Sequence, residues 1–425
     1  MPVIHQLKGC EILDSRGRPT VKAMCSFASG VSATASVPSG ASTGAAEACE
    51  LRDGDPKRYR GSGCRNAAAH LAGEMTTALG GRRVETQAEW DRALLDLDGT
   101  PNKSRLGANA ILAASLAFAR AHALDRGLPL YQHFADMSDL SLKSLPRLTI
   151  NLFSGGKHAG GQVCIQDVLL VPASAATVDD SLAMTWEIYQ CAAELVRNKY
   201  GMRALRADEG GLAPPFTSAE AMIEDAIQAI QAAGLAPGRD VSLAVDVAAS
   251  HFYENGLYQM GDTALPGSAM IDHLVQWLAD YPIVSLEDGL AEDDWAEWPV
   301  LHARAEGRAL VLGDDFLCTN PARIRRAIES QACDALLLKV NQIGTLSEAC
   351  EACQLARAAG WRVTVSARSG ETEDDWLADL AVGWAGDQIK IGSITQSERL
   401  AKYNRLLEIE ASTRLPLVPW PRASS

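Results

Sequence analysis

The sequence lacks the long apolar segments of membrane proteins and the cysteine pairing of secreted domains. No uninterrupted apolar run in its 425 residues reaches the roughly 18 residues that span a bilayer. Residues 1–8 do not show the basic and then apolar layout of a signal peptide. The ten cysteines are scattered, except for Cys350 and Cys353, and form no recognisable disulfide framework. We therefore expect a cytoplasmic protein that does not associate with membranes.

The one Cys-x-x-Cys pair, Cys350 and Cys353, has two interpretations. Zinc binding or redox chemistry would need further ligands, and no second pair exists in the sequence. The pair lies in a stretch with a helical pattern, 345–360, so packing of a helix is the favoured interpretation.

Positive charge is also scarce. The chain has 39 basic and 53 acidic residues, a net charge of −14 and a pI of about 5.1. The resulting field repels phosphate backbones and anionic lipids, so we expect neither nucleic acid nor a membrane surface as a partner. An anionic substrate would need cations supplied locally, either by metal ions or by converging lysines and arginines. The hydrophobic fraction of 47% is ample for a core, which excludes disorder as the main state.

Two parts with different patterns follow one another along the chain. Strand-like runs at 20–27 and 31–37 precede Ala-rich helical stretches, the clearest at 106–126, and predict an N-terminal α+β domain over 1–135. Beyond it, short apolar runs alternate with helical patterns, which predicts βα units with parallel strands in a second domain over 140–425. The amphipathic stretches of this second part lie at 218–233, 292–305, 321–330, 346–359 and 397–410.

Charged residues stand at the carboxyl ends of successive apolar runs in the second part. The first three runs are followed by carboxylates, and the next three are followed by cations. In order, these residues are Asp246, Glu287, Asp314, Lys339, Arg368 and Lys390, at intervals of 41, 27, 25, 29 and 22 residues. A βα unit of a closed barrel has about that length, because eight units fill roughly 250 residues. We therefore expect these side chains to converge on the mouth of one barrel.

The residue types at these positions predict a metal site beside cations. Three carboxylates without histidine or cysteine form an all-oxygen site that suits Mg²⁺ rather than zinc. Any one of them alone is more often a helix cap, but three in consecutive strand-end positions favour the metal site. A lysine beside other cations and a metal can have its pKa lowered enough to act as a base. The chemistry that fits is removal of a proton α to a carboxylate, with metal ions stabilising the enediolate.

Eight segments of the chain resemble the enolase family. The resemblance runs in order from about residue 3 to residue 410, and several of the motifs are seven to nine residues long. The segments are Asp-Ser-Arg-Gly at 14–17, Val-Pro-Ser-Gly-Ala-Ser-Thr-Gly at 37–44, Leu-Gly-Ala-Asn-Ala-Ile-Leu at 106–112, Lys-His-Ala-Gly-Gly at 157–161, Asp-Glu-Gly-Gly at 208–211, Leu-Leu-Lys-Val-Asn-Gln-Ile-Gly-Thr at 337–345, Arg-Ser-Gly-Glu-Thr-Glu-Asp at 368–374 and Ser-Glu-Arg at 397–399.

This resemblance implies an α/β fold: an enolase-type eight-fold α/β barrel that begins ββαα, with an N-terminal α+β cap. It also implies two Mg²⁺ ions, interconversion of 2-phosphoglycerate and phosphoenolpyruvate, and a homodimer or higher homo-oligomer. By motif, Asp246, Glu287 and Asp314 would bind the first metal ion. Ser39 would reach the second when its loop closes, and His158 lies in a loop that would close over the substrate.

The resemblance also implies roles for the remaining matched residues. Lys339 corresponds to the base that removes the C2 proton, and Glu209 to the acid that helps the C3 hydroxyl leave. Lys390 corresponds to the cation that faces the substrate carboxylate. Arg368 and Ser369 correspond to the phosphate clamp, for which a planar bidentate guanidinium is suited.

The chain departs from the family where the C3 hydroxyl is handled. Ala367 stands where enolases have a histidine beside the acid, so Glu209 would lose a neighbouring imidazole. Asp167 stands where they have a glutamate, and we keep it as a candidate catalytic residue because the carboxylate is retained. Both changes enlarge the pocket, and Ala367 would leave room for a larger phosphorus substituent.

Three functions follow from this pattern. The favoured one is a diverged enolase-family enzyme on a small phospho- or phosphono-carboxylate, such as the carboxyphosphonoenolpyruvate synthase of phosphinothricin-type antibiotic pathways. The second is a glycolytic enolase in which the changes are tolerated. The third is a non-catalytic enolase-like binding protein. The intact Lys339 and Lys390 argue against the third, because buried charges without a function are costly.

Overall fold

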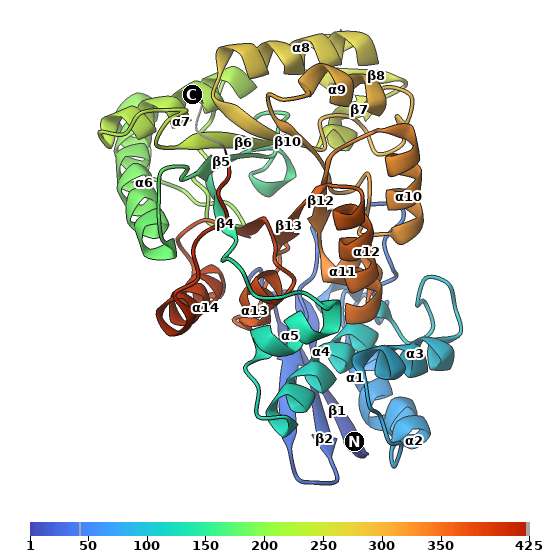
Figure 1. Ribbon diagram of the computed structural model, residues 1–425. Coiled ribbons are helices and arrows are strands. Elements are labelled where there is room, and N and C mark those ends of the chain that lie inside the picture. The colour runs from blue at the N-terminus through green and yellow to red at the C-terminus, as the bar shows by residue number, and fades with distance from the viewer. Residues whose placement is uncertain (42–43, 422–425) are drawn as a thin grey trace.

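The computed structural model describes residues 1–41 and 44–421, which form two parts (Figure 1). Ser42 and Thr43 of the motif at 37–44 lie outside the described residues. The N-terminal sheet and its helices occupy the lower half of Figure 1, and the barrel occupies the upper half. Within the described ranges, no helix has both the length and the apolar character needed to cross a bilayer.

The N-terminal part is a three-stranded antiparallel sheet covered by helices. The strand order is β1-β2-β3, with bounds Ile4–Leu13, Pro19–Phe27 and Ser32–Ser36. Helix α4, Ala108–Asp125, packs on β2 and β3, and its alanines allow a close approach to the sheet. The helix predicted at 106–126 is thus confirmed. The other helices here are α1 (Arg65–His70), α2 (Thr76–Leu79), α3 (Gln87–Asp98) and α5 (Leu130–Ser138).

The second part is a closed eight-stranded barrel with the strand order β10-β11-β12-β13-β14-β4-β5-β6. The strands are β4 (Arg147–Ser154), β5 (Asp167–Val171), β6 (Ser242–Asp246), β10 (Ile283–Glu287), β11 (Leu310–Gly313), β12 (Ala335–Leu338), β13 (Arg362–Ser366) and β14 (Gln388–Gly392). β5 runs antiparallel to both of its neighbours, and the other pairs are parallel. Two strands therefore come before the first two helices of the barrel. This order confirms the predicted ββαα start and the fold class.

Helices surround this barrel because its strands are apolar on both faces. They are α6 (Val178–Tyr200), α7 (Ala219–Ala232), α8 (Gly267–Asp280), α9 (Trp298–Ala305), α10 (Pro321–Ser330), α11 (Val340–Ile343), α12 (Leu346–Ala358), α13 (Trp376–Gly383) and α14 (Ser397–Thr413). A small sheet of β7 (Tyr253–Glu254), β8 (Leu257–Met260) and β9 (Thr263–Leu265) follows β6.

The helix predicted at 292–305 is shorter in the structure. It begins only at Trp298, and Pro299 occupies its first turn, where the missing N–H is tolerated. The preceding acidic residues form turns instead, and Asp294 accepts a hydrogen bond from the Tyr258 hydroxyl at 2.7 Å. The cysteine pair behaves as the packing interpretation predicts, because Cys350 and Cys353 lie buried and unpaired on α12.

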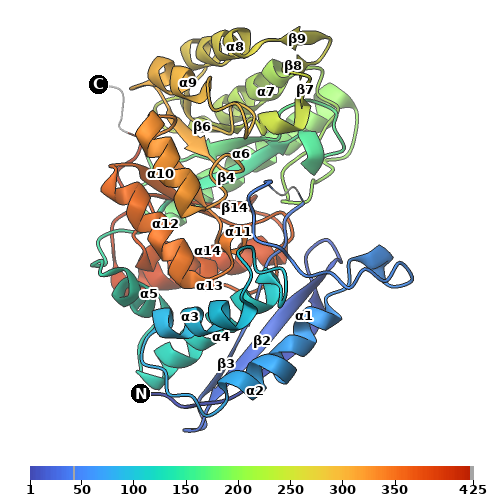
Figure 2. The same ribbon diagram turned by 90° about the vertical axis from the view of Figure 1, so that its right-hand side faces the viewer.

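The segment after β3 reaches from the N-terminal sheet to the barrel mouth (Figure 2). There Ser39 and Gly370 form an antiparallel bridge, with hydrogen bonds of 2.8 Å from Ser39 N and 3.0 Å from Gly370 N. On the other side of the cap, Asp91 of α3 accepts hydrogen bonds from the backbone N–H and the hydroxyl of Ser347. The cap is therefore joined to the barrel both at the mouth and along α12.

Candidate active site

The six charged residues predicted from their spacing lie at the same end of the barrel. Asp246 and Glu287 end β6 and β10, while Asp314 and Lys339 directly follow β11 and β12. Arg368 stands two residues after β13, and Lys390 lies within β14. All six are buried or nearly so, Lys339 being the most exposed, with 12% of its side chain accessible.

Two lysines join carboxylates from three different strands into one cluster. Lys390 Nζ donates to Asp246 Oδ2 at 2.9 Å and to the two carboxylate oxygens of Glu287 at 2.8 and 2.7 Å. Lys339 Nζ donates to Asp314 Oδ2 at 2.5 Å. The predicted convergence at one mouth therefore takes the form of direct ion pairs.

These pairs hold both lysines in their charged form. Burial alone would lower the pKa of Lys390, but Asp246 and Glu287 outweigh burial and raise it well above its ordinary value. Burial likewise opposes the charge of Lys339, and Asp314 again raises the pKa. In this arrangement the paired carboxylates stabilise the ammonium groups, and the lowered lysine pKa expected beside a bound metal ion stays a prediction.

The residue types of the cluster suit a magnesium ion, and convergence of Asp246, Glu287 and Asp314 on one ion stays a prediction, because the described groups whose ligand atoms lie within 4.8 Å of one another are His158 with Asp167 and Glu209, and Asp288 with Asp314 and Asp315. Burial and the neighbouring charge of Asp246 raise the pKa of Glu287 well above its usual range, so the carboxylates repel one another despite the lysines. Gln166 donates from Nε2 to Asp246 Oδ2 at 3.0 Å, while its own Oε1 is buried without a hydrogen-bond partner. A bound Mg²⁺ ion would offset the repulsion between the carboxylates and could accept Gln166 Oε1 as a ligand, because Mg²⁺ prefers carboxylate and carbonyl oxygens.

A neighbouring acidic group, Asp288 with Asp314 and Asp315, was not singled out from the sequence. Carboxylate oxygens of these three residues lie within 4.8 Å of one another. Asp288 accepts the backbone N–H groups of Asp314 and Asp315, each at 2.8 Å. It therefore orders the loop that presents Asp314. In the sequence, the one feature that could have identified Asp288 is its position directly after Glu287, which ends a strand.

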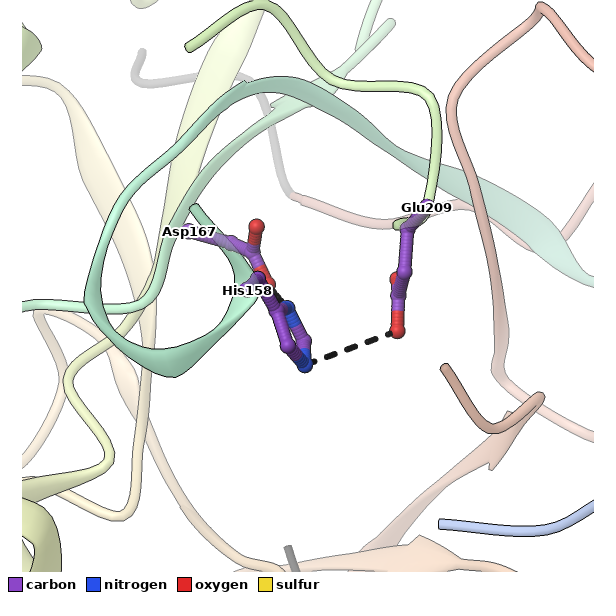
Figure 3. Close-up of side chains that lie close together, drawn as sticks. All are labelled: His158, Asp167 and Glu209. Atoms are coloured by element: carbon purple, nitrogen blue, oxygen red, sulfur yellow. Dashed lines mark hydrogen bonds and ion pairs between the residues drawn. The ribbon is translucent and has the colours of Figure 1, made fainter. Parts of the chain in front are cut away.

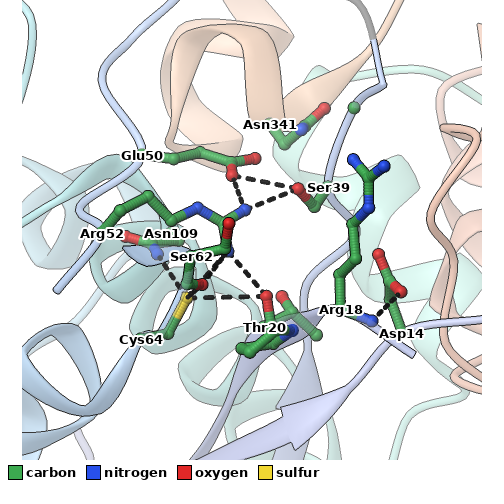
Figure 4. A network of polar contacts seen from close by, with 12 residues as sticks. Asp14, Arg18, Thr20, Ser39, Glu50, Arg52, Ser62, Cys64, Asn109 and Asn341 are labelled. Carbon is green, nitrogen blue, oxygen red and sulfur yellow. Dashed lines mark hydrogen bonds and ion pairs between the residues drawn. The ribbon is translucent and has the colours of Figure 1, made fainter. Parts of the chain in front are cut away.

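The hydroxyl of Ser39 is engaged by cap residues (Figure 4). It donates to Glu50 Oε2 at 3.0 Å and accepts a hydrogen bond from Arg52 Nη2 at 2.7 Å. The structure thus directs Ser39 toward Glu50 and Arg52, and its predicted contact with a second metal ion stays a prediction that requires the loop to move.

His158 lies between two carboxylates at the other side of the mouth (Figure 3). Its Nδ1 is 3.0 Å from Asp167 Oδ2, and its Nε2 is 4.0 Å from Glu209 Oε1. Ser154 donates to Asp167 Oδ1 at 2.6 Å, and Asn151 donates to Glu209 Oε2 at 3.1 Å. Asp167 pairs in register with Asp246, so this group adjoins the lysine–carboxylate cluster.

The charges of this group place a proton on His158. Burial alone would lower its pKa, but Asp167 outweighs burial and raises the pKa to about 9. For Glu209, burial alone would raise the pKa. The positive charges of His158, Arg399 and Lys390 outweigh burial and lower the pKa of Glu209 overall. A protonated imidazole cannot ligate a metal, so this group is better suited to proton transfer.

The sequence-based argument that Ala367 leaves Glu209 without a neighbouring imidazole is therefore wrong. His158 Nε2 lies 4.0 Å from Glu209 Oε1, so the acid has a neighbouring imidazole, supplied by the loop of His158 and not by position 367. Ala367 itself is buried beside Arg368, and its backbone N–H donates to the Lys390 carbonyl at 2.8 Å.

Arg368 has partners that sequence reasoning missed. Its Nη1 and Nη2 donate to the two carboxylate oxygens of Glu47, each at 3.2 Å, and Nη1 also donates to Asn341 Oδ1 at 2.9 Å. Arg399 donates to the carbonyls of Arg368 and Ser369 at 2.7 and 2.6 Å. Selecting charged residues at the carboxyl ends of strands does not find these partners, because they lie in a cap loop and in helices.

A closed barrel that begins ββαα, presents charged residues at its strand ends and carries an α+β cap defines a capped α/β-barrel enzyme. The chain matches the N-terminal domain of enolase over residues 4–134 and the C-terminal TIM barrel domain of enolase over residues 142–414. The chain therefore belongs to the enolase family, as the motifs predict, and is an enolase-superfamily enzyme.

Proposed function

We propose that the protein is a Mg²⁺-dependent, lyase-type enzyme that forms an enolpyruvate product from a 2-phosphoglycerate-type anion. The observation that carries this proposal is the cluster in which Lys339 and Lys390 bind Asp314, Asp246 and Glu287 at the barrel mouth. Such a cluster offers a base, a cation for a carboxylate and oxygen ligands for a metal within one site.

The metal would be held by Asp246, Glu287 and Asp314. When bound, Mg²⁺ supplies positive charge against the enediolate that develops on the substrate carboxylate. With Asp314 as a ligand, Lys339 would lose its stabilising partner, and its pKa would fall toward that of a base. The C2–H bond breaks, and the proton passes to Lys339 Nζ while Lys390 faces the substrate carboxylate.

The second half of the reaction belongs to His158 and Glu209. The enediolate electron pair forms the C2–C3 double bond as the C3–O bond breaks, and the hydroxyl leaves as water with a proton from the His158 imidazolium. Asp167 holds the imidazolium through Nδ1 at 3.0 Å, so the ring keeps its orientation during the transfer. Glu209, to which the resemblance assigns the role of the acid, is held by Asn151 at 3.1 Å, and because its pKa is lowered we assign it instead to stabilising the charge of the donor.

Two substrates fit this scheme, each favoured by one observation. The small side chain of Ala367 beside Arg368 favours a larger phosphorus substituent, as in a phosphono-carboxylate handled by a diverged paralogue such as carboxyphosphonoenolpyruvate synthase. The intact group of His158, Asp167 and Glu209 favours 2-phosphoglycerate, as in glycolytic enolase. We place the diverged paralogue first, acting in the cytoplasm as a homodimer or higher homo-oligomer.

Exchange of the C2 proton of 2-phosphoglycerate with deuterated solvent tests the reaction class. We expect exchange that requires Mg²⁺ and disappears in Lys339→Ala, because Lys339 removes the proton. Lys143→Ala is the matched control, since Lys143 is exposed. Exchange that persists in Lys339→Ala would move the role to Lys390. No Mg²⁺-dependent exchange or product with either class of substrate would favour the non-catalytic binding protein.

A further inference from the structure

Glu47 is a buried carboxylate of the cap that contacts the predicted phosphate clamp. Only 7% of its side chain and 4% of that of Arg368 are exposed. The two carboxylate oxygens meet Nη1 and Nη2 of the guanidinium in a fork-to-fork arrangement, each at 3.2 Å. Such bidentate pairs fix the plane of an arginine more strictly than a single hydrogen bond does.

The same carboxylate is tied to the loop that bears Ser39. Gly44, at the end of that loop, donates its backbone N–H to Glu47 Oε1 at 3.1 Å. Gln342 Nε2 approaches the same oxygen at 3.5 Å and donates to Asp314 Oδ1 at 2.9 Å. Glu47 is therefore the point where the cap loop, the clamp arginine and a predicted metal ligand meet.

We propose that Glu47 is a positioning residue that orients Arg368 toward the phosphorus group of the substrate and links this orientation to the seating of the cap loop. The proposal rests on the proposed function, in which Arg368 binds that group. Asn341 assists by accepting from Nη1 at 2.9 Å, so the guanidinium is held from the cap and from the barrel at once.

A cavity on the cap side makes this role testable. Glu47 lines a cavity of about 480 Å³ together with Arg18, Ser39 and Arg52. Removal of the Glu47 side chain leaves a space that a small carboxylate can reach through this cavity. Formate has the charge and the two oxygens of the lost group, so it can restore the bidentate contact with Arg368.

The experiment measures binding of inorganic phosphate to the full-length protein by calorimetry in the presence of Mg²⁺. We expect Glu47→Ala to weaken phosphate binding about tenfold or more, because a charge-assisted bidentate contact is lost. Added formate should restore most of this loss, whereas neutral formamide should not. Glu351→Ala is the matched control, since Glu351 forms an exposed ion pair with Arg325.

Three results would overturn the proposal. Unchanged phosphate affinity in Glu47→Ala would show that Arg368 is oriented without Glu47. Tighter binding would show that Glu47 competes with the anion. A loss that formate does not restore would show that phosphate binding does not depend on a carboxylate at this contact with Arg368. Arg368→Gln separates this test from the proposed function, because unchanged phosphate binding in that variant would refute the assigned role of Arg368 itself.

Discussion

Replacement of His158 by glutamine tests whether removal of the C2 proton and loss of the C3 hydroxyl depend on different residues of the barrel mouth. His158 is the proton-bearing group between Asp167, at 3.0 Å, and Glu209, at 4.0 Å. Glutamine keeps a polar side chain of similar reach but cannot carry the proton. The substitution therefore removes the donor for the C3 hydroxyl and leaves two buried carboxylates without their cation.

The pKa of His158 gives the magnitude of the effect. Asp167 and Glu209 raise this pKa from 6.5 to about 9 against the opposing effect of burial. This rise corresponds to about 3–4 kcal/mol, or about 300-fold in the preference for the protonated form. The imidazolium is therefore the prevailing form near neutral pH, and a positioned general acid contributes about 10²–10⁴-fold to a rate.

The assay compares two rates in the same variant. In His158→Gln we expect product formation to fall by about 10²–10⁴-fold, while exchange of the C2 proton with deuterated solvent is retained, because Lys339 and the metal carboxylates are untouched. His273→Gln is the matched control, since His273 forms a His–Glu pair with Glu220 at 3.1 Å on the outer helices.

Equal losses of exchange and product formation in His158→Gln would refute the assignment of the two steps to Lys339 and His158. An unchanged rate of product formation would refute the assignment of the proton donor. The alkaline limb of the wild-type profile gives a second check. Activity should decline as the pH rises past about 9, where the imidazolium loses its proton, and that decline should be absent from the residual activity of the variant.

Asp314→Asn keeps the size of the side chain but removes a negative ligand, so calorimetry should show a loss of Mg²⁺ affinity of about tenfold or more; an unchanged affinity would refute its role as a ligand. If Ala367 and Asp167 mark a changed substrate, the wild type should convert 2-phosphoglycerate more slowly than an enolase, because the enlarged pocket holds this substrate less closely, and Ala367→His with Asp167→Glu should recover part of that rate. Turnover by the wild type at ordinary enolase rates would instead identify a glycolytic enolase. Burial raises the pKa of Asp91 to about 6, so the folded protein holds a proton that the unfolded chain releases near pH 3.9, and stability should fall as the pH rises from about 4 to 6. Asp91→Asn should remove that slope from the midpoint of thermal unfolding, and parallel wild-type and variant curves would refute the contribution.

Local patterns in the sequence were enough to predict the barrel and the residues of its mouth. The helix at 321–330 and the strand that delivers Lys339 appear as predicted, because apolar period and turn residues act over a few neighbouring positions. The carboxyl ends of the strands could be located for the same reason, since Asp246, Glu287, Asp314 and Lys339 end or directly follow an apolar run, whereas Arg368 stands two residues after its strand and Lys390 lies within its own. The enolase motifs added the ββαα start, in which β5 runs antiparallel, a feature that periodicity alone does not reveal.

The tertiary structure decided which charges meet, because closure of the barrel and docking of the cap join residues far apart in the sequence. Glu47 and Arg368 are 321 residues apart and form a bidentate pair. His158 comes to Glu209 from another loop, with its Nε2 4.0 Å from Glu209 Oε1. The direction of the Lys339 pKa was likewise beyond the sequence, because it depends on the balance between burial and the carboxylate that Asp314 places 2.5 Å from its ammonium group.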